Sequence, residues 1–198
     1  MPSRAFLALT LPDPTRAFLA DACVAFRASA PGWSGEKWVA PGLFHVTVKF
    51  IGPMPDASVP RVLEALRAEG LRHGPFRLEV MDVRPVPSKR RAAMLWARLA
   101  GETESCEMLA SGFEGVLEDV LGLDRDARSF RPHVTLARAR RPRGVPAAAL
   151  EGATAVLSDT ARTAARAMSV SSATLFASTL GPAGPTYDRL GEIPLSGR

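Results

Sequence analysis

Two of the three histidines begin the same short motif. His45 begins His-Val-Thr-Val and His133 begins His-Val-Thr-Leu. Side chains alternate between the two faces of a strand, so each motif would present one imidazole and one hydroxyl, from Thr47 or Thr135, on the same surface. The intervening valines would face the core. We interpret the repeat as a duplicated site element.

Two imidazoles on one surface could supply both proton transfers of a phosphodiester hydrolysis. The unperturbed histidine pKa, near 6.5, allows the side chain to act as acid or base at neutral pH. Such acid–base help accelerates reactions by roughly 10²–10⁴-fold. The threonine hydroxyls, with an arginine nearby, would hold the phosphoryl oxygens as charge builds on them. A lone His-x-Thr is more often a half-buried histidine with a hydrogen-bonded threonine, but the presence of two such motifs favours a catalytic role.

His73, the third histidine, follows a helix end and has no such motif. We expect it to make a favourable contact with the helix dipole.

The elements that must position these residues alternate between strands and helices, which predicts an α+β fold. Apolar runs predict strands at Ala5–Leu11, Phe44–Ile51, Phe76–Val83, Met94–Leu99, His133–Ala137 and Ser169–Ala177. Helical spacing predicts helices at Thr15–Ala30, Ala57–Arg72, Glu102–Leu121 and Pro146–Ala161. None of the Pro- and Gly-rich joints between them is long enough for a domain linker, so residues 1–198 are expected to form a single domain of two packed lobes.

Composition indicates a cytoplasmic protein with an anionic partner. The first apolar stretch, Ala5–Leu11, is too short for a membrane span, and Cys23 and Cys106 fit buried free thiols. The net charge is +5, and basic residues gather at Lys89–Arg91 and along 125–143. That charge suits nucleic acid, although arginine supplies most of it and could reflect base composition of the genome instead. The stretch Arg138–Pro146 is expected to be an exposed basic loop.

The chain resembles the two-histidine (2H) phosphoesterases, and among them the LigT-like RNA 2′,3′-cyclic phosphodiesterases. The resemblance is carried by RAFLALTLP at 4–12, KWVAPGLFHVTVKFIG at 37–52, SFRPHVTLAR at 129–138 and TLFASTLGPAGPTYDRLGEIPL at 174–195. It implies a bilobal fold in which two pseudo-symmetric antiparallel sheets line a central groove, with helices on the outside. It also implies hydrolysis of a 2′,3′-cyclic phosphate to a 2′-phosphate in RNA processing, without metal. We further expect a monomer without cofactor that acts on RNA ends such as those of tRNA fragments.

The resemblance also assigns roles to residues. His45 matches the proton donor to the leaving O3′, and His133 matches the proton acceptor for the attacking water. Thr47 and Thr135 match the phosphate-binding threonines, and Arg138 matches an arginine that contacts phosphate.

Two further residues would complete the site. Phe50 matches a position associated with the terminal nucleotide. Simple alternation argues against Phe50 and Arg138, because a residue five places after a histidine lies on the opposite face of a regular strand. Both reach the groove only if the strands bend, bulge or end first. Tyr187, in a loop-like Gly- and Pro-rich context, is the best candidate to stack a base; Trp33, Trp38 and Trp96 fit packing.

Three other functions remain open. A related phosphoesterase could act on small cyclic nucleotides or ADP-ribose-type cyclic phosphates, or could ligate RNA ends. A basic RNA-binding module without turnover would show salt-sensitive binding and no hydrolysis. A metallohydrolase is disfavoured because no carboxylate-rich or closely spaced His/Cys ligand set accompanies the histidines.

Overall fold

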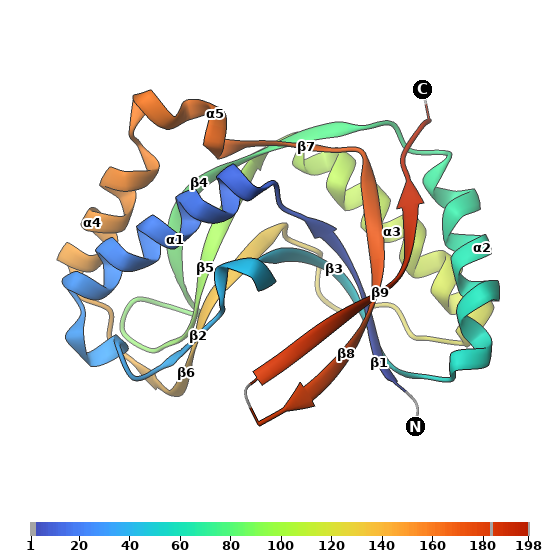
Figure 1. The fold of residues 1–198 in the computed structure, drawn as a ribbon, viewed down its shortest axis with the longest axis horizontal. Coiled ribbons are helices and arrows are strands. Elements are labelled where there is room, and N and C mark those ends of the chain that lie inside the picture. Colours follow the sequence, from blue (N-terminus) through green and yellow to red (C-terminus); the bar gives the residue numbers. More distant parts are fainter. Residues whose placement is uncertain (1–2, 183, 198) are drawn as a thin grey trace.

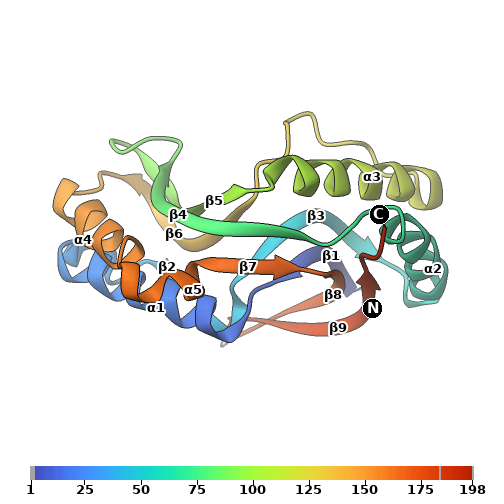
Figure 2. The same ribbon diagram turned by 90° about the horizontal axis from the view of Figure 1, so that it is seen from above.

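The strands form one curled antiparallel sheet whose two halves meet at its centre (Figures 1 and 2). The computed structural model describes residues 3–182 and 184–197, and nine strands in this part of the chain join in the order β7-β4-β5-β6-β3-β1-β8-β9, with β2 paired to β6. The α+β class and the two-half arrangement expected from the sequence are confirmed. The two expected sheets are continuous with each other.

The strands are β1 (Ser3–Thr10), β2 (Lys37–Trp38), β3 (His45–Met54), β4 (Phe76–Val86), β5 (Ala92–Gly101), β6 (His133–Arg143), β7 (Ala167–Val170), β8 (Ser172–Gly181) and β9 (Gly184–Pro194). The helices are α1 (Asp13–Ala28), α2 (Val59–Gly70), α3 (Thr103–Leu121), α4 (Ala147–Leu157) and the short α5 (Thr163–Arg166). Single 3₁₀ turns cover Pro31–Trp33, Pro41–Leu43, Asp56–Ser58 and Thr160–Arg162. The four long helices correspond to the four that apolar spacing predicts.

The helices pack on the outside of the curved sheet and leave one face of its centre free. Helices α1 and α4 pack together and α4 packs against β4, while α2 packs against β9 and α3 against β3 (Figure 1). Buried side chains of α1, such as Phe18 and Phe26, join the core that also holds Val46 and Val134. The apolar face of the two central strands is therefore covered, which leaves their other face for the motifs' polar side chains.

The two halves meet at a single residue pair. Val46 of β3 pairs with Val134 of β6, and this is the one pair through which the two strands join in the described part of the chain. On one side of this junction lie β1, β8 and β9, and on the other lie β5, β4 and β7. The junction thus relates the halves by an approximate twofold axis that passes between the two histidine motifs.

Three local predictions are wrong. The expected strand Ser169–Ala177 is two strands, β7 and β8, which lie at distant positions in the sheet because the chain leaves β4 and joins β1. The expected loop Arg138–Pro146 is mostly strand, because β6 continues to Arg143 and pairs there with Ala92. Tyr187 lies within β9 rather than in a loop, opposite Ser178.

Candidate active site

The junction of β3 and β6 brings the two histidine motifs onto one face of the sheet. Because these strands run antiparallel about the Val46–Val134 pair, His45 lies across from Thr135 and Thr47 lies across from His133. Directly opposed residues are typically about 5 Å apart and diagonal ones roughly 7–8 Å, so the two imidazoles are diagonal neighbours. We call the surface that carries these four side chains the histidine face. All four are half-buried, whereas the valines between them are buried.

The backbone holds both imidazoles by the same atom. Nδ1 of His45 lies 2.8 Å from the carbonyl oxygen of Leu43, and Nδ1 of His133 lies 2.7 Å from that of Arg131. A carbonyl oxygen only accepts, so each Nδ1 must carry the proton. The neutral rings therefore present the Nε2 lone pair to the histidine face, where Thr47 Oγ1 lies 2.9 Å from Nε2 of His45 and can donate to it.

The two rings differ in their aromatic neighbours. The indole of Trp96 on β5 stacks on His133 with ring centroids 3.7 Å apart and an interplanar angle of 20°. Phe6 lies 5.1 Å from the His45 ring, and Tyr187 meets that ring edge-on at 5.4 Å. The protein thus fixes the plane of each imidazole, by stacking in one case and by two tilted contacts in the other.

Burial and a shared cation lower the pKa of both histidines. Desolvation is the main cause for His45, where the charges of Arg138 and His133 lower the pKa further and the Leu43 carbonyl opposes them. Desolvation also lowers the pKa of His133, opposed by the Arg131 carbonyl and reinforced by Arg138. The Arg138 charge thus lowers the pKa of both histidines, and the His133 charge lowers that of His45, so the three side chains interact electrostatically.

A bulge in each motif strand returns the fifth residue after the histidine to the histidine face. In β3 the register with β1 skips Val48, and Val48 and Lys49 are both buried. In β6 the register with β5 skips Leu136, and Leu136 and Ala137 are both buried. Two successive inward residues reverse the alternation of side chains. Phe50 and Arg138, which would lie on the opposite face of a regular strand, therefore lie on the histidine face.

Arg138 and Phe50 therefore occupy equivalent positions in the two halves. Arg138 acts electrostatically on both histidines and on Tyr187, and its Nη1 lies 3.1 Å from the sulfur of Met94. Phe50 is 66% exposed, and its ring lies 6.2 Å from that of Phe6. One half of the histidine face thus offers a cation and the other an open aromatic ring.

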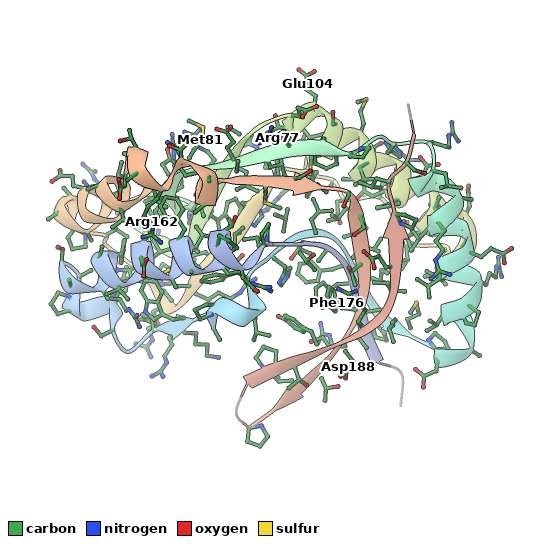
Figure 3. All side chains as sticks on the ribbon, turned by 45° about the horizontal axis from the view of Figure 1, so that its top comes forward. Arg77, Met81, Glu104, Arg162, Phe176 and Asp188 are labelled. Atoms are coloured by element: carbon green, nitrogen blue, oxygen red, sulfur yellow. The ribbon has the colours of Figure 1, made fainter. Side chains whose placement is uncertain are left out.

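An aromatic cluster surrounds His45. Phe6 stacks on Phe176 at 5.4 Å and meets Tyr187 edge-on at 4.9 Å. Phe176 belongs to β8, which pairs with β9; Figure 3 labels it and Asp188 of the neighbouring strand. The structure therefore brings Tyr187 to the site as the sequence predicts, although in a strand. Sequence reasoning missed Phe6 and Phe176, whose only signal is the apolar alternation of their strands.

A buried lysine beneath the site links the two motifs. Lys49 is 4% exposed, and its Nζ lies 2.8 Å from Oε1 of Glu114 and 3.0 Å from Oδ2 of Asp126. Burial lowers the pKa of Lys49, but its hydrogen bonds and charge contacts with these carboxylates outweigh that and raise it. Lys49 belongs to the first motif strand, while Asp126 lies in the segment that leads to His133, so the ion pairs fasten that segment to β3.

The remaining candidates lie apart from the histidine face. His73 follows the end of α2, and its Nε2 lies 3.0 Å from Oε1 of Glu69, the residue before the last of that helix. Trp33 is buried and its Nε1 donates to the carbonyl of Gly144, and Trp38 donates to that of Trp33. Cys23 and Cys106 are buried free thiols, as expected, and burial raises the pKa of each to about 12.

Two features are absent from the part of the chain that the structure describes. No set of three or more His, Cys, Asp or Glu side chains is grouped for a metal ion in residues 3–182 and 184–197. No helix in that same part of the chain is long and apolar enough to cross a membrane.

Comparison with known proteins agrees with this geometry. A family model described as the 2'-5' RNA ligase superfamily matches residues 34–178, which include both histidine motifs. The chain belongs to this superfamily. The resemblance to two-histidine phosphoesterases read from the sequence is therefore confirmed.

Curated relatives and solved structures extend the likeness over most of the chain. An RNA 2′,3′-cyclic phosphodiesterase of Aeropyrum pernix is 28% identical over 76% of this chain and 81% of its own. One from Thermus thermophilus is 29% identical over 70% of each. A crystal structure of a Thermus thermophilus protein has a TM-score of 0.77 at 28% identity, covering 98% of both chains. Apo E. coli LigT shares the fold, with a TM-score of 0.68 at 22% identity and 98% coverage of both.

Proposed function

We propose that the protein hydrolyses RNA 2′,3′-cyclic phosphate ends to 2′-phosphates by metal-independent acid–base catalysis. The observation that carries the proposal is the Val46–Val134 junction, which puts two His-x-Thr motifs on one face as diagonal neighbours. The curated relatives named above are RNA 2′,3′-cyclic phosphodiesterases, which supports the same substrate.

The two histidines divide the proton transfers. Nε2 of His133 takes a proton from a water molecule whose oxygen bonds to phosphorus, and protonated His45 gives its Nε2 proton to O3′ as the P–O3′ bond breaks. The ring is opened, the phosphate stays on O2′, and the proton gained by His133 balances that lost by His45. The Nδ1 contacts with backbone carbonyls support both roles, because they direct each Nε2 to the histidine face.

Three side chains hold the phosphoryl group during this step. Thr47 and Thr135 lie across from the histidines on the same face, where their hydroxyls can donate to the two non-bridging oxygens. Arg138 adds a cation that acts on both rings. Fixed donors of this kind contribute roughly 10²–10³-fold each at sites where charge develops.

The aromatic side of the site receives the terminal nucleotide. Phe50 exposes 66% of its surface beside Phe6, and Tyr187 meets both Phe6 and His45 edge-on. An exposed ring next to the catalytic histidine can stack a base, which is worth roughly 1–3 kcal/mol per base. We assign Phe50 and Tyr187 to the base of the cyclic nucleotide.

Product analysis in the presence of EDTA tests the proposal. An oligonucleotide with a 2′,3′-cyclic end should yield only the 2′-phosphate, and His133→Ala or His45→Ala should lower kcat by roughly 10²–10⁴-fold. His73→Ala is the matched control, because it removes the third histidine far from the face. Full activity in either catalytic variant, a 3′-phosphate product or dependence on added metal overturns the mechanism.

A substrate with a better leaving group separates the acid from the base. Bis(p-nitrophenyl) phosphate releases a stable phenolate and needs little protonation of the leaving oxygen. His45→Ala should therefore keep most of its activity on this substrate, whereas His133→Ala should lose it. The reverse pattern exchanges the two roles, and equal losses contradict the assignment.

A further inference from the structure

A basic surface continues from the histidine face along β2 and β6. Lys37 of β2 is paired across strands with Arg138 of β6, so their side chains share a face. Arg140 and Arg141 follow Arg138 in the same strand, where the register of β6 with β5 is irregular, and both are exposed. Lys37, Arg140 and the exposed Arg141, which we call the basic strip, thus begin beside the candidate phosphate-binding arginine and lead away from it.

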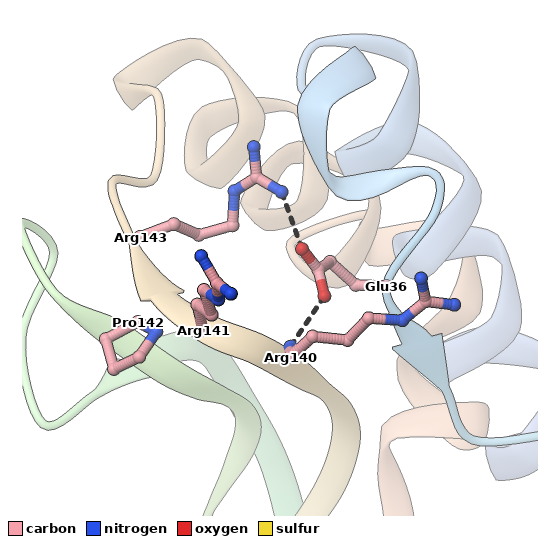
Figure 4. Close-up of a pocket in the computed structure, with 5 residues that line it drawn as sticks. All are labelled: Glu36, Arg140, Arg141, Pro142 and Arg143. Atoms are coloured by element: carbon pink, nitrogen blue, oxygen red, sulfur yellow. Dashed lines mark hydrogen bonds and ion pairs between the residues drawn. The ribbon is translucent and has the colours of Figure 1, made fainter.

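A nearly buried carboxylate holds the backbone of this strip in place. Glu36, with 9% of its side chain exposed, accepts a hydrogen bond of 2.7 Å from the backbone N–H of Arg140 and one of 2.6 Å from Nη1 of Arg143 (Figure 4). Around it lies a surface hollow of about 330 Å³ lined by Glu36 and residues 140–143. Glu36 thus forms an ion pair with Arg143 and accepts a hydrogen bond from the main chain of Arg140, and the charge of Arg140 also lowers the pKa of Glu36.

The side chains of the basic strip form no ion pair within the part of the chain that the structure describes. The ion pairs of residues 3–182 and 184–197 include Arg143 but none of Lys37, Arg140 or Arg141. A second basic segment, Lys89–Arg91, is exposed beside them, because the Lys89 carbonyl accepts from Val145 and Ala92 pairs with Arg143. A surface with this much uncompensated positive charge favours an extended polyanion.

We propose that the basic strip binds the backbone phosphates of the nucleotides that precede the cyclic end, so that the substrate is a polynucleotide. The inference rests on the proposed function, because the cyclic phosphate fixes where the strand begins. Arg141 is three residues after Arg138, a length of chain that spans at most about 10 Å, so the strip lies close enough to the cyclic phosphate to meet the phosphates that precede it. Guanidinium groups suit this task, since their planar donors bind phosphate oxygens in pairs.

The test compares one chemistry on two lengths of substrate. Arg140→Ser/Arg141→Ser is assayed on adenosine 2′,3′-cyclic phosphate and on a pentanucleotide with the same terminal nucleoside. The control is Arg61→Ser/Arg77→Ser, which removes two exposed arginines outside the ion pairs of the described residues, one from α2 and one from β4, where Figure 3 labels Arg77. Arg140→Ser retains the backbone N–H that Glu36 binds, so the fold of the strip is preserved.

The expected result is specific to the longer substrate. For the pentanucleotide, KM of the strip variant should rise about tenfold, equivalent to loss of one to two phosphate contacts. The slope of log KM against log salt should also fall by roughly 1.4, at about 0.7 for each phosphate of a single strand. Turnover of the mononucleotide should not change, and the control variant should match the unmodified protein on both substrates.

Other outcomes contradict the inference. An unchanged KM for the pentanucleotide leaves the strip as a solvated surface or a site for a different anion, and an equal rise on both substrates makes it part of the catalytic site. A parallel binding measurement uses a fluorescent pentanucleotide that already ends in a 2′-phosphate. If the unmodified protein hydrolyses neither cyclic substrate, the proposed function fails, while a tenfold weaker binding of this probe by the strip variant would still support the strip as a polynucleotide site.

Discussion

Replacing Arg138 by glutamine should move the pH profile of the reaction toward higher pH. The Arg138 charge lowers the pKa of both histidines, so its removal must raise both values. In the proposed mechanism kcat/KM requires neutral His133 and protonated His45. The acid limb and the alkaline limb of the bell should therefore both shift upward in Arg138→Gln, although each limb reports the coupled pair rather than one ring.

The size of the shift follows from the strand register. Arg138 is the next side chain on the histidine face after Thr135, which lies across from His45. One such step is roughly 7–8 Å. A unit charge about 8 Å away contributes about 0.5 kcal/mol in water and about 2 kcal/mol at an effective dielectric constant of 20. The pKa of His45 should therefore rise by an amount that an NMR titration resolves, and that of His133, two steps away, by less.

The two histidine titrations are measured by NMR in the unliganded protein, alongside kcat/KM from pH 4.5 to 8.5. Arg138→Lys is the control, because it keeps the charge and loses the paired donors. It should raise KM while leaving both pKa values close to those of the unmodified protein. If both histidines titrate unchanged in Arg138→Gln, Arg138 does not act on the site through its charge and the reasoning fails.

Three further substitutions test the surroundings of the site. Trp96→Leu should lower the pKa of His133, because a stacked indole stabilises a cation by roughly 0.5–2 kcal/mol; a raised pKa in the NMR titration would mean that Trp96 acts mainly by excluding water. Lys49→Met should cost about 3 kcal/mol in urea unfolding, since it leaves a poorly exposed carboxylate unpaired, and unchanged stability would contradict this. Phe50→Ala should raise KM about tenfold with kcat nearly constant, whereas Met108→Ala, a comparably exposed apolar residue on α3, should change neither.

The sequence predicts the motif residues because their signal is local. A His-x-Thr on a strand needs only the alternation of side chains to place imidazole and hydroxyl on one face. The repeat of the motif predicts the approximate twofold axis that relates the two halves. Both inferences agree with the Val46–Val134 junction. The four long helices could also be predicted, since their apolar spacing reports the one face that each buries.

The rest depends on contacts that no local pattern encodes. Whether Arg138 and Phe50 reach the site is decided by bulges at Leu136 and Val48, where a strand gains one residue relative to its neighbour. Such a bulge is a property of two paired strands, so the sequence of one strand alone does not reveal it. Trp96 likewise becomes a neighbour of His133 only through the pairing of β5 with β6.

The structure also shows how a repeated motif can serve two different roles. The backbone treats both histidines alike, since each Nδ1 binds the carbonyl two residues before it. The difference comes from adjoining strands. His133 has an indole face against it, which favours the cation formed when it accepts a proton. His45 has tilted aromatic contacts and a hydroxyl on Nε2, and the charge of His133 opposes its protonation. A phosphodiester anion between the rings would offset that opposition, so binding of substrate itself would help His45 hold the proton that it must donate.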